Sequence, residues 1–211
     1  MRPGSITRYW AERIAASGCG KNDGLGGFSF ATPLATSFTS GPGPDWTLDS
    51  IMVPLLRHSD ASTTRSINVS VFSDPSGLPG STLVSLTGPL ISKDKGPVNC
   101  RFTPTSSFLI APSTTYWVVL SDSPGIGLEQ VFWEGTLDRA ETGFTGWSIG
   151  DKAYEYSGGG WSENLGEGIS DPSKFEVAAS VVPLPAAAWL FGSALLGVAG
   201  LGYRSKRRSA V

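Results

Sequence analysis

The chain has 211 residues, including 27 Gly and 15 Pro, and 16% of its residues are charged. Gly and Pro at this frequency interrupt helices and form turns, which argues against a helical bundle and favours many short strands. The net charge is -2, but four basic residues lie within the last eight positions, so the rest of the chain carries 12 basic against 18 acidic side chains. Such an acidic body repels phosphate backbones, and we expect no nucleic-acid partner.

Residues 1–27 form an N-terminal segment to which we assign no domain. A secretory leader has a basic start, an apolar run of about 7–15 residues and a small-residue cleavage site. Arg8, Glu12 and Arg13 interrupt every such window here. There is no clear signal peptide, and we expect that the start of this reading frame is mis-assigned or that the leader has been lost from it. For Cys19 and Cys100 we favour two unrelated thiols over a disulfide, because their spacing supports no pairing.

Residues 28–178 alternate apolar and polar positions with period two, and turn residues recur at intervals of about ten residues. This pattern predicts an all-β domain, with a β-sandwich or jelly-roll-like arrangement. Segment 114–120 is apolar on both faces, so we place it centrally in a sheet. Pro54 predicts an edge strand or a bulge because proline cannot donate to a ladder. The strands that the alternation marks most clearly are 51–55, 67–71, 98–102 and 114–120.

Two short segments predict the connections between strands. Asp74-Pro-Ser-Gly77 has Pro at the second position and Gly at the fourth, which is typical of a type I turn. Gly158-Gly-Gly160 predicts a mobile loop.

The same region resembles the choice-anchor R family over roughly residues 28–178. Members of that family are exported bacterial proteins in which similar ectodomains are joined to different surface anchors. The resemblance implies display outside the cell and supplies no ligand. It is carried by Leu34-Ala-Thr-Ser-Phe-Thr-Ser-Gly41, Trp46-Thr-Leu-Asp-Ser-Ile51, Val69-Ser-Val-Phe-Ser-Asp74, Gly77-Leu-Pro-Gly-Ser81 with Leu83 and Leu86, Thr115-Tyr-Trp-Val-Val-Leu120 and Trp147-Ser-Ile-Gly150.

Trp133, Trp147 and Trp161 are separated by equal intervals of fourteen residues, and Tyr154 and Tyr156 lie between the last two. One interpretation is a stacking platform for sugar rings, which would make the domain a carbohydrate-binding module for exopolysaccharide. The other interpretation, which we favour, is three core residues of a sandwich with regular hairpins.

We expect no enzyme activity, no metal site and no cofactor. His58 is the single histidine, and its neighbours Ser59 and Asp60 generally point apart in a turn, whereas a triad meets across a fold. Paired carboxylates meet in space rather than in sequence, so a hydrolase stays open as an alternative that no local motif supports. Calcium usually needs a dense acidic loop, and the acids here are scattered.

The C-terminal segment 181–211 has the features of a membrane anchor. Residues 186–203 carry no charge, and as a helix these 18 residues span roughly 27 Å, close to the thickness of a bilayer core. The basic residues that follow stay on the cytoplasmic side, so the N-terminal domain faces outward. These topology-setting residues are Arg204, Lys206, Arg207 and Arg208.

The tail resembles the PEP-CTERM sorting signal in its VPLPA variant. The likeness covers about thirty residues: a proline motif, an apolar helix and a basic end, in that order. The resemblance implies a Gram-negative bacterium that makes exopolysaccharide, and a membrane-embedded exosortase as the partner that processes the tail. The residues that match the proline motif are Val182, Pro183, Leu184, Pro185 and Ala186.

The sequence therefore predicts a non-catalytic, exported protein of the cell envelope or biofilm matrix. It is first held in the inner membrane with its β-domain outside, and it reaches the surface or matrix after processing.

Overall fold

The computed structural model describes residues 4–8, 27–29, 32–57, 66–91, 98–122, 131–134, 141–164 and 173–182. All regular structure in these ranges is antiparallel β, which confirms the predicted all-β class. The predicted helix 186–203 lies outside the described residues, and no helix within them is long and apolar enough to cross a membrane. The strands are β1 (Gly4–Arg8), β2 (Gly27–Ser29), β3 (Leu34–Thr39), β4 (Trp46–Arg57), β5 (Ile67–Ser73), β6 (Thr82–Thr87), β7 (Val98–Pro104), β8 (Leu109–Ile110), β9 (Thr115–Asp122), β10 (Val131–Glu134), β11 (Glu141–Thr142), β12 (Ser148–Ser157), β13 (Gly160–Glu163) and β14 (Glu176–Val181).

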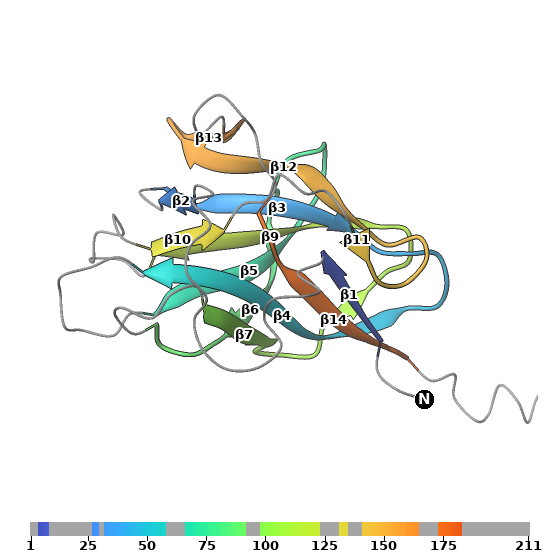
Figure 1. Cartoon of the computed structure of the whole chain (residues 1–211). Helices are drawn as coiled ribbons and strands as arrows, with labels where there is room; N and C mark the ends of the chain where they lie inside the picture. The colour runs from blue at the N-terminus through green and yellow to red at the C-terminus, as the bar shows by residue number, and fades with distance from the viewer. Residues whose placement is uncertain are drawn as a thin grey trace, which may run out of the picture. The chain divides into compact units, whose positions relative to one another are not determined.

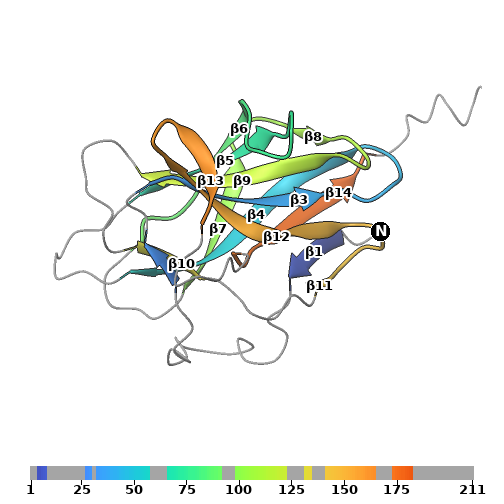
Figure 2. The same cartoon turned by 90° about the horizontal axis from the view of Figure 1, so that it is seen from above.

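Eleven of the described strands follow one hydrogen-bonded order, β11-β1-β14-β4-β7-β6-β5-β9-β3-β12-β13. Off this path, β8 and β10 pair with β4, and β2 pairs with β10. Strand β7 joins two groups, because residues 98–102 pair with β4 whereas Thr103 and Pro104 pair with β6. Strands β11, β1, β14 and β4 lie on one side of this junction, and β6, β5, β9, β3, β12 and β13 lie on the other. Both groups can be followed in Figure 1, and Figure 2 shows them from above.

One hydrophobic core receives side chains from both groups of strands. Alternation puts every second side chain on the core face, as the sequence predicts. Ile51, Val53 and Leu55 of β4 are fully buried, and so are Val69 and Val71 of β5. Phe38 of β3 contacts Phe175, which precedes β14, with ring centroids 6.4 Å apart. The two groups therefore bury their apolar faces against each other.

Strand β4 is an interior strand, so the edge position that Pro54 predicts is wrong. On one side β4 pairs with β7 along residues 51–55. On its other side the partner changes from β14, which pairs up to Met52, to β10, which pairs from Leu55. Pro54 lies in the gap between these two partners. The proline is tolerated there because a missing N–H costs least where no ladder continues.

The chain bends at residues 75–78, where the sequence predicts a turn, and the expected loop at residues 158–160 is a tight hairpin. The Gly77 N–H donates to the Asp74 carboxylate, which closes the first turn. Ser157 pairs with Gly160, leaving Gly158 and Gly159 as a two-residue connection with φ of 62° and 87°. Positive φ at both central residues defines the type I′ turn, which suits the twist of a hairpin.

The compact unit of the chain runs from Met1 to Val181, and a second unit comprises Val182–Val211. Strand β1 pairs with β14 and β11, so residues 4–8 belong to the sheet although they lie in the segment to which the sequence assigned no domain. Its sequence Gly-Ser-Ile-Thr-Arg contains one apolar residue, which explains why no alternation marked this strand.

Candidate functional site

The structure places Trp133 and Trp147 in the main hydrophobic core. Trp133 of β10 is fully buried, and its Nε1–H donates to the carbonyl oxygen of Lys174 at 2.7 Å. Trp147 precedes β12, stacks on Phe38 with centroids 6.3 Å apart and meets Trp46 edge to face at 5.4 Å. These two indoles have no free face for a sugar ring, so for them the core interpretation holds.

Trp161 lies on the opposite face of the sheet from that core. It belongs to β13, is half-buried, and packs over a second small cluster formed by Ala35, Trp117 and Val119. The three tryptophans with equal spacing therefore do not form one platform. The interval from Trp147 to Trp161 crosses the β12–β13 turn, where Tyr156 pairs with Trp161. Tyr156 and Trp161 therefore point to the same face, although they are an odd number of residues apart. Equal spacing across a turn does not predict which face of a sheet a residue lies on.

A different set of aromatic residues shares the face that carries Trp161. We call this set the outer aromatic face. Trp117 and Tyr154 meet edge to face with ring centroids 5.1 Å apart, and Tyr156 and Trp161 meet in the same way at 5.4 Å. Phe72 packs against the same buried cluster. The members of the outer aromatic face come from four strands and are Phe72 (β5), Trp117 (β9), Tyr154 and Tyr156 (β12) and Trp161 (β13).

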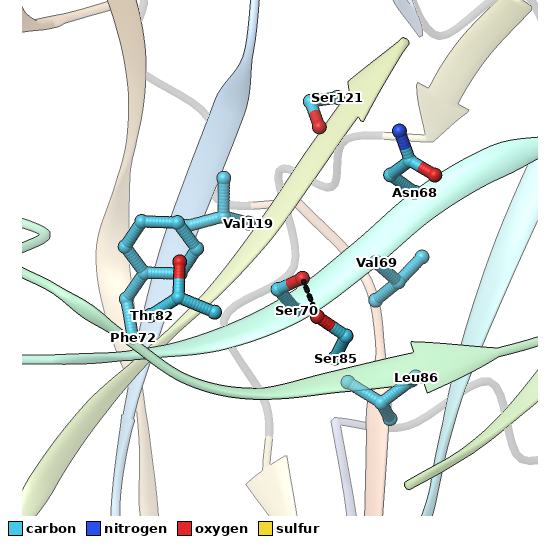
Figure 3. Close-up of a pocket in the computed structure, with 9 residues that line it drawn as sticks. All are labelled: Asn68, Val69, Ser70, Phe72, Thr82, Ser85, Leu86, Val119 and Ser121. Carbon is cyan, nitrogen blue, oxygen red and sulfur yellow. Dashed lines mark hydrogen bonds between the residues drawn. The ribbon is translucent and has the colours of Figure 1, made fainter. Parts of the chain in front are cut away.

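A pocket of about 300 Å³ adjoins the outer aromatic face between β6, β5 and β9. Figure 3 shows Phe72 and Val119 on one side of it and Asn68 and Ser121 on another, with Ser70 and Ser85 between them. Ser70 Oγ donates to Ser85 Oγ at 3.4 Å, which is long for a hydroxyl pair. Every residue that lines the pocket is uncharged. The pocket thus combines an apolar wall with hydroxyl and amide groups.

The nearest described ion pair on these strands is Lys152 with Glu163, whose Nζ–Oε2 distance is 2.6 Å. The hydrogen bond that Lys152 donates to the Glu163 carboxylate raises the pKa of Lys152, and the charge of that carboxylate raises it further. Both side chains are solvent-accessible, so the pair fastens the β12–β13 hairpin without a large effect on stability.

Cys100 of β7 is a buried free thiol in the core. Burial raises the pKa of Cys100 to about 11, so the thiol stays protonated and unreactive at neutral pH. Its alternating neighbour Phe102 is fully buried, whereas Val98 is 37% exposed at the strand's start.

Most residues of the predicted sorting signal lie outside the described part of the chain. Val182 follows the end of β14 and is half-buried, whereas residues 183–186 and the basic residues 204–208 are not described, and neither is His58. Among the described residues no group of three His, Cys, Asp or Glu side chains could hold a metal ion.

Comparison with protein-family models and with curated proteins finds no match to this chain. The two family resemblances therefore stay predictions from the sequence.

Proposed function

We propose that this chain is an exported protein of the envelope or extracellular matrix of a Gram-negative bacterium. Its domain is a β-sandwich displayed outside the inner membrane, and its C-terminal segment is a sorting signal that a membrane-embedded exosortase recognises. The domain itself is non-catalytic. The observation that carries the proposal is the order of the tail: Val182-Pro-Leu-Pro-Ala186, eighteen uncharged residues from Ala186 to Tyr203, and then a basic end.

The boundary of the fold supports this assignment. Strand β14 ends at Val181, the compact unit ends at the same residue, and the proline motif begins at Val182. A processing enzyme needs an extended peptide that it can reach, and prolines disfavour both helix and sheet pairing. Cleavage after the motif would also leave every strand of the described domain intact.

The distribution of charge supports the orientation. Four basic residues follow the apolar segment directly, and basic flanks stay on the cytoplasmic side. The remainder of the chain has 12 basic and 18 acidic side chains. It therefore has no excess of basic residues that would favour the cytoplasmic side of the inner membrane. Replacing Arg204, Lys206, Arg207 and Arg208 by Gln should weaken this orientation.

The proposal is tested by the double substitution P183A/P185A, expressed in the native host with an internal epitope in the domain. We expect the variant to accumulate at full length in the inner membrane, while the natural sequence is shortened and leaves that membrane. The control is Val181→Ala, one position before the motif, at a side chain that is 44% exposed. Equal processing and release of all three proteins would refute the role of the motif.

A further inference from the structure

We propose that the outer aromatic face and the adjoining pocket form a binding site for a neutral glycan. The site shares only Trp161 with the platform expected from Trp133, Trp147 and Trp161, because the other two tryptophans lie in the core. It rests only on the described β-domain, so it does not depend on whether the tail is a sorting signal.

The register of the strands places the parts of this site in one row. Ser85 of β6 pairs with Ser70 of β5, which pairs with Val119 of β9. Val119 pairs with Ala35 of β3, and Ala35 pairs with Tyr154 of β12. Directly paired residues point to the same face of a sheet. Four strand spacings of about 4.8 Å give the row a length of roughly 19 Å, which suits an oligosaccharide better than a single sugar.

A parallel row supplies the aromatic wall next to the pocket. Phe72 pairs with Trp117, and Trp117 pairs with Ser37. Trp117 is only 3% exposed, so it is the floor of the cluster, and its Nε1 is buried without a hydrogen-bond partner among the described residues. Tyr156 is 41% exposed, and Phe72, Tyr154 and Trp161 are half-buried. These four rings therefore offer surface on which a ligand can stack.

The chemistry of the lining selects the class of ligand. A pyranose ring has a C–H face that stacks on aromatic rings and a rim of hydroxyls that needs hydrogen-bond partners. The pocket supplies such partners in Ser70, Ser85 and Ser121, and a long Ser70–Ser85 bond can be exchanged for bonds to a ligand hydroxyl at little cost. No cation lines the pocket to neutralise a uronate or a phosphate. The ligand class is accordingly an uncharged oligosaccharide.

Size and shape agree with this assignment. A volume of about 300 Å³ lies at the lower end of the range for small-molecule sites, about 300–1,000 Å³. The pocket can thus hold one sugar unit, while neighbouring units stack along the row toward Tyr154. All-equatorial hexoses expose C–H groups on both ring faces, so β-linked glucose is the most suitable probe.

The test uses the full chain in a detergent without a sugar head group, titrated with cellohexaose and monitored by isothermal titration calorimetry. We expect saturable binding, and no binding of hexagalacturonate, which has the same length but carries a carboxylate on every unit. Trp161→Ala and Ser85→Ala should each weaken cellohexaose binding at least tenfold. The matched control is Leu109→Ala, because Leu109 is 54% exposed on β8, whose partner is β4.

Circular dichroism and the thermal midpoint establish that each variant is folded. If Trp161→Ala does not fold, Ser85→Ala still tests the site. Absence of saturable binding of cellohexaose by the natural sequence at 10 mM would overturn the proposal. Equal affinity for hexagalacturonate would overturn it too, and so would unchanged cellohexaose affinity in both Trp161→Ala and Ser85→Ala. If the natural chain binds no glycan but self-associates, and Trp161→Ala and Ser85→Ala abolish this association, the face is a protein interface instead.

Discussion

Replacing Trp133 by Phe separates the core interpretation of this residue from the surface interpretation. The substitution keeps an aromatic ring but removes the Nε1–H that donates to the Lys174 carbonyl, which links β10 to the segment entering β14. Loss of a buried hydrogen bond of this kind costs about 0.5–1.5 kcal/mol. The smaller ring also leaves a void of roughly 40 Å³ beside Phe175, which adds about 1 kcal/mol at about 24 cal/mol per Å³.

The expected decrease in unfolding free energy is therefore about 2 kcal/mol, from the hydrogen-bond and cavity contributions together. For a domain of this size the same change lowers the thermal midpoint by roughly 4–8 °C. Urea unfolding monitored by circular dichroism measures the free energy, and an unchanged m value shows that the variant still unfolds as the same cooperative unit.

The matched control is Trp161→Phe on the opposite face. Trp161 is half-buried, and its packing is with the outer aromatic face rather than with the core. We expect this control to change stability by less than about 0.5 kcal/mol, as surface substitutions usually do. Equal effects of the two substitutions, or a change below about 0.5 kcal/mol for Trp133→Phe, would refute the placement of these tryptophans on different faces.

Three other predictions concern the packing, the core thiol and the hairpin. Gly88→Ala should lower the unfolding free energy by about 1–3 kcal/mol through overpacking, because its Cβ would meet the buried Phe102 ring at 2.1 Å. The double variant with Phe102→Leu should lose less stability than the sum of the two single losses, and an additive loss would contradict the contact. In a Cys19→Ser background, Cys100 should react with iodoacetamide only in urea, and rapid alkylation of the folded protein at pH 8 would show that the thiol is accessible. Because the pKa of Cys100, about 11, exceeds that of an unfolded thiol, the unfolding free energy should fall as pH rises from 9 to 11. Gly159→Val should destabilise the β12–β13 hairpin because φ is 87° there, whereas Gly158→Asn at 62° should be tolerated, and amide exchange of β13 distinguishes the two; equal protection in both variants would exclude the type I′ turn.

The alternation of apolar residues predicted the fold class correctly and the direction of many side chains. Ile51, Val53 and Leu55 face the core as the pattern indicates, and the segment that is apolar on both faces, 114–120, forms the interior strand β9. The reason is that a period-two pattern directly encodes which side of a strand is buried. Pro54 was misinterpreted because an interior strand can change partners along one edge, and sequence does not show where such a change occurs.

The candidate site was harder to predict, since it is assembled from residues that are distant in sequence. Phe72 follows Asn68 and Ser70 on the outward side of β5, so the alternation alone could have identified it as an exposed-side aromatic residue. Trp117 gave a weaker signal, because a strand that is apolar on both faces is usually read as fully buried. The pairing of Ser70 with Val119 depends on strand order, which local sequence does not determine.

The most direct test of the central claim is the intact mass of the mature protein isolated from its native host, with separate inner-membrane, surface and medium fractions. We expect a surface or medium form that retains β14 and lacks the residues after the Val182–Ala186 motif. A single form in the inner membrane that still carries the entire tail to Val211 would contradict it.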